Sequence, residues 1–77
     1  MENALLIRTE WDEEGRVWVA TSDDVAGLAT EADNMEALCA KLKIIVPELL
    51  SANGYPGSDN IRYELVTRKL QAANTRY

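Results

Sequence analysis

The residue types that could carry chemistry in this chain are carboxylates and one thiol. Two acidic clusters stand out, Asp12-Glu13-Glu14 and Asp23-Asp24, and Cys39 is the only cysteine. The 77 residues include no histidine, so the commonest acid–base group and metal ligand is absent, and the serines lack a histidine to activate them. The sequence therefore predicts no catalytic residue, no cofactor and no metal site, and we expect a protein that is not an enzyme.

The two acidic clusters allow more than one interpretation. Paired carboxylates can bind Mg²⁺ or Ca²⁺, but neither cluster has the alternating ligand spacing of a calcium loop. Short runs of Asp and Glu are also typical of solvated turns. If the clusters have a function, we favour contact with a basic protein over metal binding. A carboxylate-and-metal hydrolase is the least favoured alternative; magnesium-dependent nuclease activity lost on mutation of Asp23 and Asp24 would support it.

Charge is unevenly distributed along the chain, whose net charge is −5. Ten of the thirteen acidic residues lie in residues 1–36, together with only Arg8 and Arg16 as bases. Binding to phosphate requires a basic surface, so we expect no direct nucleic-acid binding. The acidic half is compatible with a basic protein partner, and it also serves solubility.

Length and cysteine content place the chain among small intracellular domains. A core of this size often depends on oligomerisation. One cysteine allows no internal disulfide, and no apolar run approaches the ~18 residues of a membrane span. The N-terminus also lacks the basic and apolar regions of a signal peptide. We expect a cytoplasmic, non-membrane protein.

The clearest structural element is a helix over Asn34–Asn53. Asp33 is a suitable N-cap with Glu36 three residues on, and Gly54 stands where a left-handed C-cap would fall. The stripe continues beyond Pro47, so we expect a bend there and not an end. Apolar residues recur every three or four positions and form one stripe: Met35, Leu38, Cys39, Leu42, Ile45, Val46, Leu49 and Leu50. A thiol on this stripe is expected to pack in the core and to be unreactive.

Four segments read as strands: Ala4–Trp11, Arg16–Ser22, Leu28–Glu31 and Ile61–Thr67. The order β-β-β-α-β and the short connections predict an α+β fold, an antiparallel sheet with one long helix packed on one face. We expect one domain over residues 1–77, ordered over about 4–67, with a loop at 54–60 and a frayed tail at 68–77.

The strand patterns assign residues to the two faces of the sheet. The helix is expected to meet one face, which carries Leu5, Ile7, Val17, Val19, Leu28, Tyr63 and Leu65. The open face would then carry Leu6, Trp18, Ala20 and Val66. A face with Trp and Leu is unusual if it meets only water, so we expect a homo-oligomer, a dimer formed through this face or an edge strand.

The middle of the chain also carries an ordered set of motifs. A strand at Trp18–Ser22 is followed by the Asp-Asp turn, by Val25-Ala26-Gly27 and by Thr30-Glu31-Ala32-Asp33-Asn34 at the helix start. Over about residues 4–54 this set resembles the HicB-like family of antitoxins. The Leu-Lys-x-x-Val-Pro-Glu-Leu-Leu run at 42–50 is similar to a small uncharacterised branch of that group. The resemblance implies a β-β-β-α-β fold related to part of a double-stranded-RNA-binding domain.

The resemblance also implies a function in toxin–antitoxin systems. HicB-like antitoxins bind and block a small basic HicA-type RNA-cleaving toxin, and they usually add a C-terminal DNA-binding domain. Only about ten residues follow the last predicted strand, so the DNA-binding part is not implied here.

We therefore expect a non-catalytic protein-interaction module. The residues expected to bind the partner are Asp23, Asp24 and Glu31 for charge and Trp18 as an apolar anchor. Reversal of Asp23 and Asp24 to Lys is expected to weaken such a complex. The alternative is a stand-alone homo-oligomeric domain with a structural or small-ligand-binding role.

Overall fold

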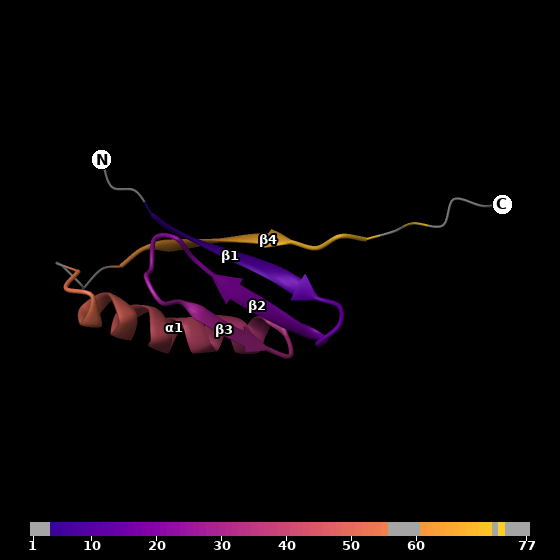
Figure 1. The fold of residues 1–77 in the computed structure, drawn as a ribbon, viewed down its shortest axis with the longest axis horizontal. Coiled ribbons are helices and arrows are strands. Elements are labelled where there is room, and N and C mark those ends of the chain that lie inside the picture. The colour runs from indigo at the N-terminus through magenta and orange to yellow at the C-terminus, as the bar shows by residue number, and fades with distance from the viewer. Residues whose placement is uncertain (1–3, 56–60, 72, 74–77) are drawn as a thin grey trace.

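A computed structural model describes residues 4–55, 61–71 and 73 and contains five elements (Figure 1). They are, in order, β1 (Leu5–Asp12), β2 (Val17–Thr21), β3 (Ala29–Ala32), α1 (Met35–Ala52) and β4 (Tyr63–Arg68). The predicted α+β class and element order are confirmed. The predicted loop at 54–60 and tail at 68–77 lie partly outside the described residues. No helix in the described ranges is both long and apolar enough to cross a membrane.

The four strands form one mixed sheet in the order β3-β2-β1-β4. β1, β2 and β3 make the predicted antiparallel meander, whereas β4 pairs parallel to β1. The prediction that the whole sheet is antiparallel is therefore wrong. The reason is the length of α1. Its 18 residues span roughly 27 Å, close to the ~26 Å of the eight-residue β1. The helix thus returns the chain to the end of the sheet where β1 begins, and β4 starts there.

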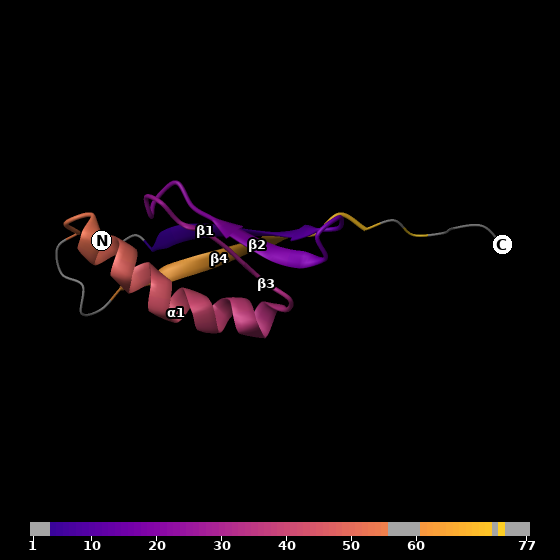
Figure 2. The same cartoon turned by 60° about the horizontal axis from the view of Figure 1, so that its bottom comes forward.

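The helix covers one face of the sheet (Figure 2). Its stripe of Leu38, Leu42, Val46 and Leu50 is buried, and the first three are fully inaccessible. Its backbone approaches the sheet over β2 and β3 and not over β4. The other buried apolar residues lie on the strands and on the turn between β2 and β3: Ile7, Ala20, Val25, Leu28 and Ala32.

The face assignment of β2 is reversed from the prediction. Trp18 packs against the core and Ala20 is fully buried, so these two residues face the helix. Since Thr9 opposes Ala20 in the β1–β2 register, Ala20 shares the side of the buried Thr9. Val17 and Val19 therefore lie on the open face, and the expectation that they meet the helix is wrong.

The open face is accordingly more polar than predicted. Leu6 and Val66 lie on it as expected and are 38% and 44% exposed. Strand alternation and register add both charges and valines to this face: Arg8, Glu10, Val17, Val19, Glu31, Glu64 and Arg68. Isolated apolar residues among charges are ordinary on a protein surface. This face by itself thus gives no reason for dimerisation.

The helix begins one residue later than predicted. Asn34 is the N-cap, and its side-chain Oδ1 accepts a hydrogen bond from the backbone N–H of Ala37 at 2.7 Å. The prediction that Asp33 caps the helix, with Glu36 as the partner in a capping box, is wrong. Both Asp33 and Asn34 are suitable caps by residue type, and only the backbone path decides between them.

The C-terminal end of α1 matches the prediction. Gly54 has φ +76°, which a glycine adopts without strain. The N–H of Tyr55 donates to the carbonyl of Leu50 at 2.9 Å, and that of Gly54 donates to Ser51 at 3.1 Å. These two bonds make a Schellman motif. The helix continues past Pro47, as predicted, and ends at Ala52.

Replacement of Leu42 by Ala should destabilise the domain by about 2–5 kcal/mol, because it removes fully buried methyl groups and leaves a cavity. Ile44→Ala is the matched control two residues along the same helix, since Ile44 is 63% exposed. Urea unfolding followed by circular dichroism measures both. Equal midpoints for the two variants would contradict the assigned helix face.

Candidate functional site

The turn after β2 docks onto the beginning of β1 through side chains. Oδ2 of Asp24 accepts a hydrogen bond from the backbone N–H of Leu6 at 2.8 Å. The Ser22 hydroxyl donates to the carbonyl of Leu6 and accepts from the N–H groups of Asp24 and Val25. Strand β2 has already ended at Thr21, so these side chains replace the missing strand as partners of Leu6. The predicted partner-binding residue Asp24 therefore has a structural role.

Asp23 is placed differently from its neighbour. Its side chain is 83% exposed and forms an ion pair with Arg8 at 3.1 Å, at the edge of the open face. An exposed pair of this kind contributes little to stability and is readily exchanged for another partner. Asp23 is thus accessible to a second molecule.

Two tryptophans and a lysine meet at the opposite end of the sheet, beside the β1–β2 hairpin. Trp11 and Trp18 lie opposite each other in register, with ring centroids 5.4 Å apart and planes at 62°, an edge-to-face pair. Nζ of Lys69 lies 5.4 Å from the centroid of Trp11 and 5.9 Å from that of Trp18. The indole N–H of Trp11 donates to Oε1 of Glu13 at 3.0 Å. The two rings already hold a cationic side chain.

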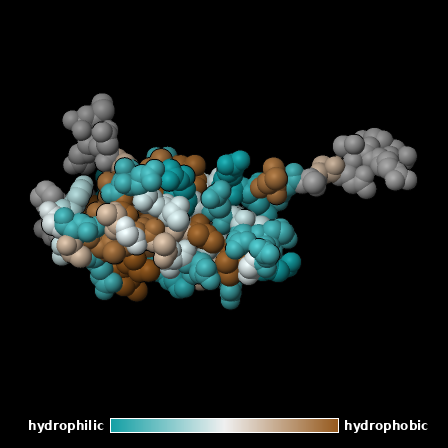
Figure 3. Space-filling model, viewed as in Figure 1, coloured by the Kyte–Doolittle hydropathy of each residue, from teal (hydrophilic) through white to brown (hydrophobic). Residues whose placement is uncertain are grey.

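Acidic residues of the hairpin and of the start of α1 lie at the same end of the sheet as this aromatic pair. Figure 3 shows hydrophilic residues gathered at the end of the molecule that carries the hairpin. The hairpin and the start of α1 adjoin, because Val17 and Asp33 line the same shallow hollow. We call this region the acidic hairpin end; it consists of Trp11, Trp18, Asp12, Glu13, Glu14, Asp33 and Glu36. Much of the acidity of residues 1–36 is thus concentrated in space.

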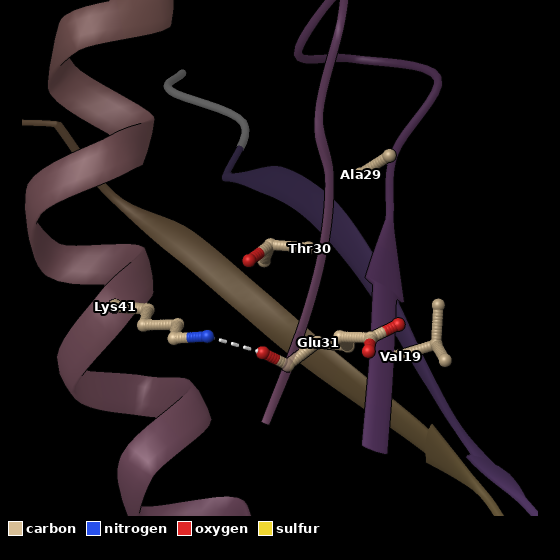
Figure 4. A pocket seen from close by; sticks show the side chains of 5 residues that line it. All are labelled: Val19, Ala29, Thr30, Glu31 and Lys41. Atoms are coloured by element: carbon tan, nitrogen blue, oxygen red, sulfur yellow. Dashed lines mark hydrogen bonds between the residues drawn. The ribbon is translucent and has the colours of Figure 1, made fainter. Parts of the chain in front are cut away.

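Glu31 lies on the edge strand β3. Figure 4 shows Lys41 reaching from α1 to the backbone oxygen of Glu31, to which its ammonium donates a hydrogen bond. The Glu31 carboxylate points towards Val19, whereas Thr30 points towards α1. The hollow here, of about 380 Å³, is lined by Val19, Ala29, Thr30, Glu31 and Lys41. Across the described ranges, no group of three or more Cys, Asp or Glu side chains is arranged to hold a metal ion.

The thiol and a phenol lie near each other between α1 and β4. Cys39 is half-buried and unpaired with another cysteine. Burial, with a smaller contribution from the charge of Cys39, raises the pKa of Tyr63 above its ordinary value of 10.0. Tyr63 is therefore neutral at physiological pH.

The four residues predicted to bind a partner do not form one patch. Trp18 belongs to the acidic hairpin end, Glu31 lies on the open side of β3, and Asp23 and Asp24 lie at the far end of the sheet. Sequence reasoning missed Trp11 and Lys69. The sequence contained the information needed to find Trp11, since a tight hairpin loop between the first two strands brings Trp11 and Trp18 together.

The fold is that of a small α+β domain with shallow hollows along the sheet. The chain belongs to the family described as Domain of unknown function (DUF1902), which it matches over residues 4–75. It is also similar to the crystal structure of the hypothetical protein TTHA1013 from the extremely thermophilic bacterium Thermus thermophilus. The two are 44% identical, the match covers 94% of this chain and 99% of that chain, and the TM-score is 0.72. No curated protein matches the chain.

The unequal roles of Asp23 and Asp24 can be tested by comparing Ala at each position. Asp24→Ala should lower the free energy of unfolding by about 1 kcal/mol, because the N–H of Leu6 loses its acceptor. Asp23→Ala should lower it by less than about 0.5 kcal/mol, because only an exposed ion pair is lost. Denaturant titration of the two single variants measures the difference, and a larger loss at Asp23 would contradict the assigned contacts.

The cation–π contact of Lys69 predicts a second pair of variants. Lys69→Met keeps the apolar stem but removes the charge over the two indoles, and should cost about 0.5–1 kcal/mol. Tryptophan emission should change with it. Lys43→Met is the control, since Lys43 is exposed on α1 and has no ion pair or ring contact within the described residues. An unchanged emission spectrum and stability in Lys69→Met would show that the ammonium does not sit on the rings in solution.

Proposed function

We propose that this chain is a non-catalytic interaction module that binds a small basic protein, in the manner of a HicB-type antitoxin blocking an RNA-cleaving toxin. The observation that carries the proposal is the acidic hairpin end, where five acidic residues lie at the same end of the sheet as the half-buried Trp11–Trp18 pair, and Glu13 accepts a hydrogen bond from Trp11. The β-β-β-α-β order and the motif resemblance at residues 18–34 and 42–50 support the assignment to HicB-like domains.

The acidic hairpin end has the two properties that a basic partner requires. Its carboxylates attract and orient a positively charged surface during encounter, an effect that weakens as salt rises. The edge-to-face indoles offer a platform for a cationic side chain, and Lys69 occupies it in the isolated chain. A Lys or Arg of the partner could take the same place, with Trp18 as the anchor predicted from the sequence.

The chain's own groups suit binding better than catalysis. A toxin would be blocked by covering its basic RNA-binding surface with carboxylates, which occupy the positions that phosphates would otherwise take. Glu31 lies next to this region on β3, since its neighbour Ala32 opposes Trp18. Asp23 and Asp24 lie at the other end, so a partner touching them would have to span the sheet.

The proposal is tested with the tagged chain in a lysate of the source cell, followed by mass spectrometry. We expect a small basic protein in near-equal amount that cleaves RNA when purified alone and is inhibited when this chain is added back. Glu14→Lys with Asp33→Lys should reduce capture and inhibition at least about tenfold, because charge complementarity is reversed at the acidic hairpin end.

The control is Asp23→Lys with Glu48→Lys, which changes net charge equally on surfaces away from the acidic hairpin end. Unchanged inhibition with this pair supports the proposed contact. Loss confined to this pair would place the contact at the far end, as the sequence predicted for Asp23. Recovery of no protein, or of one that cleaves no RNA, would contradict the antitoxin role and favour the stand-alone homo-oligomeric domain as the alternative.

A further inference from the structure

The two edges of the sheet are different. β3 is four residues long, and Lys41 reaches across from α1 to bind the carbonyl of Glu31. A short edge strand guarded by a lysine resists pairing with another chain. β4 is six residues long and pairs with β1 on one side only. Its outer edge presents backbone donors and acceptors that can accept another strand.

The hydrogen-bond pattern identifies which residues of β4 face outwards. The N–H of Leu5 donates to the carbonyl of Arg62 at 3.0 Å, so the backbone groups of Arg62 are directed towards β1. In a parallel pair these groups alternate along the strand. The even-numbered residues of β4 therefore bond to β1, and the N–H and C=O groups of Tyr63, Leu65 and Thr67 point to the free edge.

We propose that β4 pairs with β4 of a second copy of this chain, antiparallel, with Val66 on the two-fold axis. In this register Leu65 opposes Thr67 of the second copy, and both have backbone groups directed outwards, as a hydrogen-bonded pair needs. Glu64 then lies directly opposite Arg68 of the second copy, and Arg68 opposite Glu64. The symmetry gives two such pairs of opposite charge on the open face.

Both charges are available for this pairing. Neither Glu64 nor Arg68 forms an ion pair or side-chain hydrogen bond within the described part of the chain, although Glu10 lies beside Arg68 in the β1–β4 register. They occupy non-hydrogen-bonded positions of the new pair, where facing side chains are closest. Opposite charges placed directly across such a pair are stabilising.

The neighbouring symmetric registers are less favourable. An axis at Leu65 would place Arg68 opposite Arg62, and one at Glu64 would place that carboxylate opposite itself. An axis at Thr67 would place Arg68 opposite Val66. Like charges directly opposite are destabilising, so the charges of β4 select the register centred on Val66.

The partly exposed apolar residues of β4 also favour a second copy of this chain at the β4 edge. Val66, 44% exposed, meets its own copy on the open face. On the other face α1 lies over β2 and β3, which leaves Tyr63 and Leu65 only half-buried. A two-fold axis perpendicular to the sheet places both helices on the same face, on either side of the paired β4 strands. The two Leu65 side chains become diagonal neighbours between them, within contact distance.

The inference is independent of the proposed function, because the acidic hairpin end takes no part in the pairing and the assay needs no partner protein. The test is sedimentation equilibrium from low to high micromolar concentration. We expect the wild-type chain to approach twice its mass of 8.6 kDa. Glu64→Arg or Arg68→Glu alone should raise the dimer dissociation constant about tenfold or more, since each turns two attractive pairs into repulsive ones.

Complementation distinguishes this register from general charge effects. The double exchange Glu64→Arg with Arg68→Glu should restore the dimer, and an equimolar mixture of the two single variants should form a heterodimer. The charge-matched controls Glu14→Arg and Arg16→Glu, in the β1–β2 loop, should dimerise like wild type, while circular dichroism checks that each variant is folded. A wild-type monomer at the highest concentration, a dimer indifferent to both reversals, or no rescue by the double exchange would overturn the proposal.

Discussion

The length of α1 relative to the sheet is the constraint on which the remaining architecture depends. The helix begins beside the hairpin end of the sheet and ends beside the beginning of β1, so the chain re-enters the sheet parallel to β1. Thr9 and Thr67 come opposite each other as a result, and their hydroxyls lie 2.9 Å apart. Thr9 is the one buried polar residue of the described ranges, and this contact satisfies its hydroxyl.

The position of the helix also determines which apolar residues remain partly exposed. Because α1 packs over β2 and β3, its stripe buries Ala20 and Ala32, whose small side chains allow close approach. The tryptophans and the β4 residues Tyr63 and Leu65 lie at the margins of this contact and stay half-buried. Both proposed interaction surfaces lie at these margins, where burial of further apolar area is still possible.

Much of the fold could be predicted from the sequence, and its failures have particular physical causes. The helix, Gly54 at its end and the faces of β1 and β4 follow from local periodicity in amphipathic segments. The face of β2 does not, because Val17 to Ala20 are all apolar and alternation carries no information there. The direction of β4 depends on the length of a helix relative to a sheet, which no local pattern records. For the candidate site, Trp18 and the acidic character were predictable, whereas the contact of Lys69 joins residues over fifty positions apart.

The acidic residues illustrate why the type of a residue does not reveal its role. Asp24 and Glu14 both lie in turns next to β strands and carry the same charge. The carboxylate of Asp24 meets the unpaired N–H of Leu6 beyond the end of β2, so its charge is engaged within the fold. At Glu14 the backbone N–H donates a hydrogen bond to the carboxylate of Asp12, and the side chain of Glu14 remains at the surface. Glu64 is a third case: strand alternation places it on the open face of the edge strand β4, where the proposed second copy would bring its Arg68 opposite. The role of a carboxylate in this fold therefore depends on the backbone donors near it and on its place in the strand register. The number of acidic residues does not reveal whether one of them stabilises the fold, as Asp24 does, or is left at the surface for the proposed contacts.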